Sequence, residues 1–143
     1  DGQLEGALSL TKAGSSTLTL NGGGNTCSGV TTVSGGTLDV YAVSSLGNSM
    51  RGIVTTGGTL RLRGTSAVPD AAVLLISDGG SRVRVDSGTE TVGALYLGGK
   101  RQRRGTFGPS TSDAQYKNDT YFSTLGTGVI NVLHGPESVI SVR

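Results

Sequence analysis

The sequence predicts an all-β, single-domain fold, a parallel β-solenoid whose rungs, each with short strands and glycine corners, are about 22 residues long. Three observations support this prediction: a repeated corner-plus-strand unit, alternation of apolar side chains within each unit, and an unusual composition. Glycine occupies 25 of the 143 positions, aromatic residues make up 4% of the chain and tryptophan is absent. A core made from such residues is thin and consists of many small side chains rather than a few large ones.

The repeated unit is a glycine corner followed by a short strand. The clearest copies are GGTLDV at residues 35–40, GGTLRL at residues 57–62, and a third copy with one inserted residue that begins at Gly79-Gly80. Residues 14–20 and 126–132 are more divergent copies. Repetition at a fixed spacing is the signature of a solenoid, because each coil buries its apolar face only by stacking on its neighbours.

Apolar residues alternate inside every copy. The alternating pairs are Leu18/Leu20, Leu38/Val40, Leu60/Leu62, Val83/Val85 and Ile130/Val132. A period of two places them on one face of a strand, toward the interior. Further β-prone runs lie between the copies, at residues 29–33, 52–55, 72–76 and 92–97. Residues 66–75 have some helical character, but Pro69 and the β-branched residues that follow favour a loop leading into a strand.

An antiparallel β-sandwich would also show short strands and frequent turns. Its usual signal is a two-residue Asn-Gly or Asp-Gly hairpin between consecutive strands. Asn21-Gly22 and Asp78-Gly79 are of this type, but each lies in a glycine run where a solenoid corner is expected. The sequence therefore favours the solenoid. Stacking each repeat on the next then places Asp39 beside Arg61 and Arg61 beside Arg84, which predicts an exposed row of charges.

Composition argues against several classes of protein. The net charge of +2 is too small to indicate a nucleic-acid partner. The one cysteine, Cys27, allows neither an internal disulfide nor a thiolate metal site, and we expect it to face the interior; an exposed Cys27 would instead cross-link subunits. No apolar run approaches the roughly 20 residues of a membrane helix, so no membrane span is expected. The chain opens at Asp1, consistent with a removed signal peptide or an excised fragment.

Two parts of the sequence resemble a known family. Residues 10–22, 25–33 and 35–38 resemble the autotransporter-associated β-strand repeat, although the usual form has an aromatic residue where Cys27 stands and a glycine where Val30 stands. The later segments resemble the module that closes such arrays in secreted bacterial proteins; these segments are residues 68–73, 90–97, 105–107 and 126–128.

The resemblance covers nearly all of residues 6–133. It implies a right-handed parallel β-helix that is exported and acts as a stalk, passenger or surface-polymer segment, and it brings no catalytic motif. We therefore expect a solenoid domain over residues 1–133, with repeat rungs to about residue 91 and a closing module with a hairpin over residues 92–133. Residues 134–143 lie outside the resemblance and form a β-prone tail. The expected location is extracellular or on the cell surface.

No catalytic or metal-binding constellation stands out. The acidic residues form no Asp-Asp or Asp-x-Asp pair, whereas a polysaccharide-cleaving β-helix enzyme needs clustered carboxylates. The only histidine, His134, has no histidine or nearby cysteine as a partner, and we expect it in a solvent-facing turn. Gly22-Gly23-Gly24 lacks the lysine and the helix of a phosphate-binding loop. The sequence predicts no catalytic residue, cofactor or metal.

One cluster of positive charge is conspicuous, formed by Lys100, Arg101, Arg103 and Arg104. It follows Gly98-Gly99, so we expect it on a hairpin loop between residues 92–97 and 106–107. Two interpretations stay open: a solubilising turn or subunit contact, and a patch for an acidic polysaccharide, lipopolysaccharide or nucleic acid. No aromatic residue is interleaved to stack bases, so no nucleic-acid partner is expected.

Two features near the C-terminus bear on the ends of the solenoid. Tyr116, Tyr121 and Phe122 are expected to cap the core; the alternative is an exposed platform for a partner. The tail after Gly135-Pro136 is strongly β-prone, through Ser138, Val139, Ile140, Ser141 and Val142. We hypothesise that this tail adds as a strand to a neighbouring subunit, which would give a head-to-tail homopolymer.

These observations predict a non-enzymatic extracellular structural protein, a self-assembling surface filament or stalk subunit. The first alternative is an adhesin or glycan-binding passenger module with a cell-surface polysaccharide as partner. The second alternative is a polysaccharide-cleaving β-helix enzyme.

Overall fold

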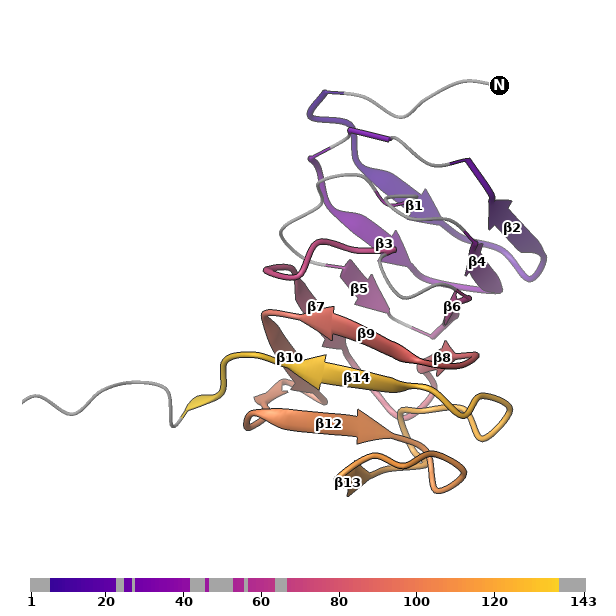
Figure 1. The fold of residues 1–143 in the computed structure, drawn as a ribbon. Coiled ribbons are helices and arrows are strands. Elements are labelled where there is room, and N and C mark those ends of the chain that lie inside the picture. The colour runs from indigo at the N-terminus through magenta and orange to yellow at the C-terminus, as the bar shows by residue number, and fades with distance from the viewer. Residues whose placement is uncertain are drawn as a thin grey trace, which may run out of the picture.

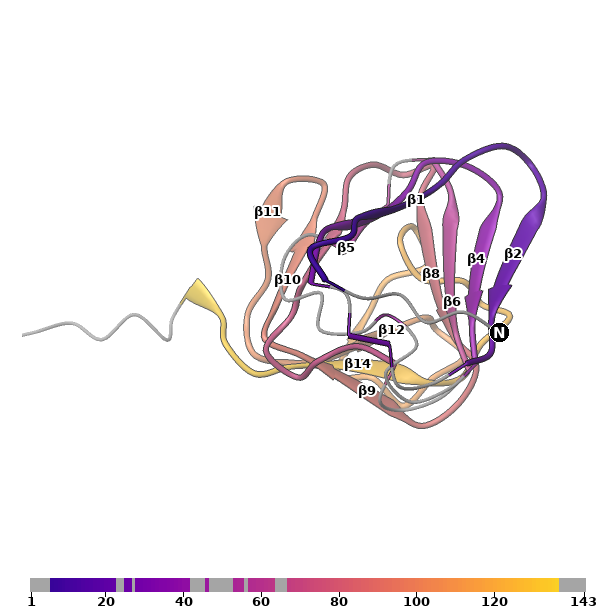
Figure 2. The same ribbon diagram turned by 90° about the horizontal axis from the view of Figure 1, so that it is seen from above.

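The protein winds into a coil of stacked strands (Figure 1). The computed structural model describes residues 6–22, 25–26, 28–41, 46, 53–55, 57–63 and 67–136. In Figure 2, viewed from the N-terminal side, the chain runs clockwise as it recedes from the viewer, so the solenoid is right-handed. The expected fold class is therefore confirmed.

Three sheets form the walls of the solenoid. The first has the order β1-β3-β5-β7-β10-β11, the second β2-β4-β6-β8, and the third β13-β12-β14-β9. The strands are β1 (Leu10–Lys12), β2 (Thr17–Leu20), β3 (Thr31–Val33), β4 (Thr37–Val40), β5 (Ile53–Thr55), β6 (Thr59–Leu62), β7 (Val73–Ile76), β8 (Arg82–Val85), β9 (Thr89–Val92), β10 (Ala94–Leu97), β11 (Lys100–Arg101), β12 (Gly105–Gly108), β13 (Tyr116–Lys117) and β14 (Val129–Val132).

The apolar residues of successive turns stack in register. In the second sheet one interior column runs Leu18, Leu38, Leu60 and Val83, and the next runs Leu20, Val40, Leu62 and Val85. Within β4, β6 and β8 these side chains are at most 3% exposed. All pairs in the second sheet are parallel, so the antiparallel sandwich is excluded; among the described strands, antiparallel pairing occurs only in β10–β11 and β12–β14.

Corners between the walls are closely packed. Gly36 has φ +60, and a Cβ atom at this position would overlap the carbonyl oxygens of Ser16 and Gly14 in the preceding turn. The same corner is hydrogen-bonded to both neighbouring turns, because Thr37 N donates to Ser16 O and Thr59 N donates to Gly36 O. Glycine is therefore required here both for its backbone conformation and for its lack of a side chain.

Residues 126–132 form a corner and a strand, as the divergent copy predicts, but on a different wall. β14 lies between β12 and β9 in the third sheet rather than next to β8. The position beside β8 is instead taken by Phe122, which forms a single parallel bridge with Val83. The regular spacing of the repeat is lost after β9 because the chain inserts the hairpin and the cap before it returns to the coil.

The C-terminal aromatic residues cap the core. Phe122 is 1% exposed, Tyr121 packs against the buried cluster, and the rings of Phe107 and Tyr116 lie 4.9 Å apart. The prediction of a capping loop is confirmed for Tyr116, Tyr121 and Phe122. At the other end, Leu18 is 38% exposed, because no strand of the described chain lies beyond β2 in its sheet.

Candidate binding face

The outer face of the second sheet carries a row of charged side chains. Alternation in β4, β6 and β8 turns Leu and Val inward and leaves Asp39, Arg61 and Arg84 outward, in register on adjacent strands. The register confirms the predicted row of charges, but the expected exposure is wrong for Asp39, which is 3% exposed because the arginine side chains that bind it cover it. Two arginines directly opposite each other repel, so their juxtaposition needs a compensating anion.

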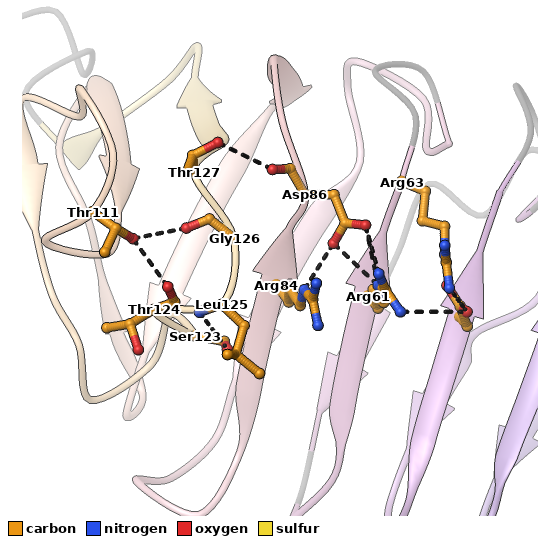
Figure 3. A network of polar contacts seen from close by, with 11 residues as sticks. Arg61, Arg63, Arg84, Asp86, Thr111, Ser123, Thr124, Leu125, Gly126 and Thr127 are labelled. Atoms are coloured by element: carbon orange, nitrogen blue, oxygen red, sulfur yellow. Dashed lines mark hydrogen bonds and ion pairs between the residues drawn. The ribbon is translucent and has the colours of Figure 1, made fainter.

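Asp86, which directly follows β8, supplies that anion (Figure 3). Its Oδ1 and Oδ2 accept hydrogen bonds from Arg61 Nε and Nη2 at 3.0 and 2.8 Å. The same carboxylate lies 2.8 Å from Arg84 Nε. One carboxylate therefore holds two guanidinium groups on neighbouring strands.

Asp39 forms a second ion pair on the same face. Both of its carboxylate oxygens accept hydrogen bonds from Arg63, at 2.8 Å each, in a bidentate arrangement. Arg61 Nη1 lies 3.9 Å from Asp39 Oδ2, which links the two ion pairs into one network. The Arg63 guanidinium also lies 4.1 Å from the ring centroid of Tyr41, a cation–π distance.

The network fixes the charges of its members. The hydrogen bond from Arg61 lowers the pKa of Asp86, against the opposing effect of burial, and the charge of Arg84 lowers that pKa further. Hydrogen bonds to Asp86 and Asp39 raise the pKa values of Arg61 and Arg63. A general acid in glycoside hydrolysis needs a carboxyl group with a raised pKa. The hydrogen bonds from Arg61 lower the pKa of Asp86, which is the opposite of what a general acid needs.

A groove of about 270 Å³ runs along this face. Its lining consists of Thr17, Thr37, Asp39, Thr59, Arg61, Arg82, Arg84, Ser123 and Leu125. One wall is the segment 123–127, which is bonded to the edge of β8: Ser123 N donates to Val83 O and Thr127 N donates to Asp86 O. Thr111 Oγ1 donates to Gly126 O at 2.7 Å and supports the same segment from behind (Figure 3).

The basic cluster lies elsewhere. Lys100 and Arg101 form the exposed edge strand β11, which pairs with β10, while β12 belongs to another sheet. The expected hairpin is thus present but closes on β11 instead of residues 106–107. Arg103 lies 5.6 Å from the ring centroid of Tyr116 and Arg104 lines a separate open groove with Gln115. Figure 2 places β11 on the opposite side of the solenoid from β2-β4-β6-β8.

Sequence reasoning missed a buried carboxyl group. Glu90, in β9, is 0% exposed; its Oε2 accepts a hydrogen bond from Ala67 N at 3.0 Å, and its Oε1 has no hydrogen-bond partner among the described residues. Burial raises the pKa of Glu90 to about 7, against the lowering effect of the backbone hydrogen bonds from Ala67 and Val68, and the charge of Asp70 raises it further. Alternation was the available signal, since it places Glu90 on the inward face with Val92.

The other predicted residues have simple positions. His134 is exposed and its backbone N–H donates to Gly93 O, in agreement with a solvent-facing turn. Cys27 and the tail residues Ser138, Val139, Ile140, Ser141 and Val142 lie outside the described residues. In the part of the chain that is described, no three His, Cys, Asp or Glu side chains gather as a metal site would require. The same part contains no helix of the length and apolar character needed to cross a membrane.

Two comparisons relate the chain to known proteins. Residues 10–40 match the passenger-associated-transport-repeat family. The adhesin BmaC autotransporter of Brucella suis biovar 1 (strain 1330) is 30% identical over 144 aligned residues, which cover 94% of this chain. The chain spans about 4% of the length of that relative. No solved structure matches the chain.

Proposed function

We propose, because the chain belongs to the autotransporter passenger-repeat family, that it is a non-enzymatic, extracellular segment of an adhesin-like passenger. The observation that carries this proposal is the similarity to an adhesin along 94% of the chain. The right-handed solenoid and the residues 10–40 that match the repeat agree with a passenger role. The arrangement of Asp39 and Asp86, each bound to arginine, favours a binding surface over an acid–base site.

The fold suits a surface that holds a ligand by many weak contacts. Parallel strands stack about 4.8 Å apart, so every outward position repeats as a straight row of side chains. Backbone hydrogen bonds between turns fix these rows. A ligand then meets side chains that are already ordered, which lowers the entropy lost on binding.

The basic cluster is the proposed adhesive contact. Lys100, Arg101 and Arg103 are exposed and lie on or next to a sheet edge. Long cationic side chains at an edge keep it from pairing with another strand, and they also attract anionic cell-surface polysaccharide. The same positions could instead be occupied by a neighbouring subunit, which the adhesion experiment distinguishes.

Beads coated with the purified chain should adhere to cultured epithelial cells more than albumin-coated beads do, and free chain should compete for adhesion. Replacing Lys100, Arg101, Arg103 and Arg104 by glutamine should reduce adhesion several-fold, because the anionic cell surface loses its cationic contact. The matched control is Lys117→Gln, which removes one exposed cation elsewhere. Adhesion of wild-type beads no greater than that of albumin beads would refute the adhesive role. Full adhesion by the variant with four glutamines would refute the assignment of the basic cluster as the adhesive contact.

Self-assembly is the second candidate function. The observation that favours it is the exposure of Leu8 (48%) and Leu18 (38%) on the first described turn, an apolar surface on which a further turn, from the same polypeptide or from a second copy, would stack. If the tail supplies the connecting strand, deletion of residues 136–143 should convert filaments into monomers in electron micrographs and in sedimentation. Filaments that persist after the deletion would show that the tail does not connect the subunits. A wild-type chain that stays monomeric would exclude self-assembly.

A further inference from the structure

We propose that the groove on the outer face of β2-β4-β6-β8 binds the carboxylate or sulfate group of an anionic polysaccharide, with Arg84 and Arg61 as its anion ligands. This site is distinct from the basic cluster of residues 100–104. It lies on the opposite side of the solenoid (Figure 2), so either site can fail experimentally without the other.

The guanidinium groups are already held in place for a second anion. Asp86 fixes Arg61 through two hydrogen-bonding nitrogens and fixes Arg84 through an ion pair at Nε. The Arg84 contact is 2.8 Å long, but the Nε–H does not point at the carboxylate oxygen, so this buried donor has no hydrogen-bond acceptor among the described residues. The terminal nitrogens of Arg84 make no hydrogen bond with any described residue, and the residue lines the groove. Arg84 therefore has donors to spare.

The face has an excess of positive charge. Four arginines, at positions 61, 63, 82 and 84, accompany two aspartates, Asp39 and Asp86. Arg82 donates to the backbone carbonyls of Gly79 and Thr120, which are neutral acceptors and leave its charge uncompensated. Two positive charges are consequently not neutralised within the network. Arginine binds carboxylate and sulfate through paired N–H groups, as it does phosphate.

The remaining lining suits a sugar. Thr17, Thr37 and Thr59 stand in register on β2, β4 and β6 and present a row of hydroxyl groups along the groove. The opposite wall carries Leu125, which is 74% exposed and offers an apolar surface for the C–H face of a pyranose ring. A volume of about 270 Å³ is slightly below the roughly 300 Å³ at which typical small-molecule pockets begin. The groove therefore holds one or two sugar units of a longer chain.

Isothermal titration calorimetry on the purified chain should detect two probes, a heparin-derived hexasaccharide with sulfate groups and an oligogalacturonate with carboxylate groups. A neutral dextran oligosaccharide should not bind. Arg84→Gln should weaken binding roughly tenfold or more, because it removes a charge-assisted contact. Binding should also weaken as salt concentration rises. The heparin fragment carries carboxylate as well as sulfate groups, whereas the oligogalacturonate carries carboxylate groups alone. Equal binding of both probes therefore identifies carboxylate as the group recognised, and binding of the heparin fragment alone identifies sulfate.

Two further variants make the result decisive. Leu125→Glu places a negative charge in the groove at a position with little burial, so it should weaken anion binding several-fold while the thermal midpoint stays unchanged. Lys117→Gln, which removes an exposed cation outside both the groove and the basic cluster, is the control and should bind as the wild type does. The proposal is overturned if neither anionic probe binds, if dextran binds equally well, or if Arg84→Gln and Leu125→Glu bind like the wild type. It is also overturned if binding of the anionic probes is lost only when Lys100, Arg101, Arg103 and Arg104 are replaced by glutamine, a result that would assign the binding to the basic cluster instead.

Discussion

Lowering the pH from 8 to 5 should stabilise this protein, through the carboxyl group of Glu90. In the folded state burial raises the pKa of Glu90 to about 7, whereas the ordinary value of the unfolded chain is 4.5. Between these two pH values the folded state keeps a proton that the unfolded chain has lost. The contribution of Glu90 to stability is therefore complete below pH 4.5 and is lost as the pH rises through 7. One pKa unit corresponds to about 1.4 kcal/mol, so the free energy of unfolding should fall by on the order of 3 kcal/mol between pH 5 and pH 8.

Glu90→Gln should remove this pH dependence. Glutamine resembles the protonated carboxyl group in shape and charge, and its amide oxygen can still accept the hydrogen bond from Ala67 N. We expect the variant to match the wild type at pH 5 and to exceed its stability at pH 8. Urea unfolding followed by circular dichroism at pH 5, 6, 7 and 8 measures the difference.

The control for this experiment is Asp70→Asn, which removes the neighbouring exposed carboxylate and should flatten the profile only slightly. Asp86 contributes in the opposite direction but in another window: its pKa is lowered by Arg61, so its contribution is lost only as the pH falls below its ordinary value of 3.8. A wild-type stability that is flat from pH 5 to 8, or a Glu90→Gln variant that keeps the full slope, would contradict the assignment.

The interior of the second sheet was predictable because its residues obey two simple rules. Equal spacing of the glycine corners fixes the register between turns, and alternation fixes which side chains point inward. Together they predicted that Leu38 stacks on Leu60 and that Asp39, Arg61 and Arg84 share an outward row. Both predictions depend only on local geometry, which the chain repeats from turn to turn.

The third sheet was less predictable because its partners are not set by that spacing. β14 joins β9 only after the chain has passed through the β10–β11 hairpin and the cap. Glu90 was missed for a related reason: its Oε2 accepts a hydrogen bond from the backbone N–H of Ala67, in a segment that the repeat pattern does not bring beside it. Asp86 also lay outside the predicted row, since it follows β8 and reaches back to Arg61 on the adjacent strand.

Replacing Gly36 by alanine should destabilise the protein far more than the same change at Gly14. Both glycines have positive φ, +60 and +77, so each alanine would incur the roughly 1–2 kcal/mol cost of a left-handed conformation. Only at Gly36 would the new methyl group also overlap backbone atoms, the carbonyl oxygens of Ser16 and Gly14; at Gly14 no atom lies within 4 Å. Overpacking of this kind costs a further 1–3 kcal/mol or so.

The clash at Gly36 has no cheap relief, because the obstructing carbonyls belong to the corner that holds successive turns together. Moving Ser16 O away would stretch its hydrogen bond from Thr37 N, and moving Gly36 would disturb the bond that its own carbonyl accepts from Thr59 N. We therefore expect Gly36→Ala to lose about 2 kcal/mol more than Gly14→Ala in urea unfolding, with the same loss of β-structure signal at the transition. Equal losses in the two variants would mean that backbone conformation alone selects glycine at these corners, and that neighbouring turns are not packed closely enough to exclude a methyl group.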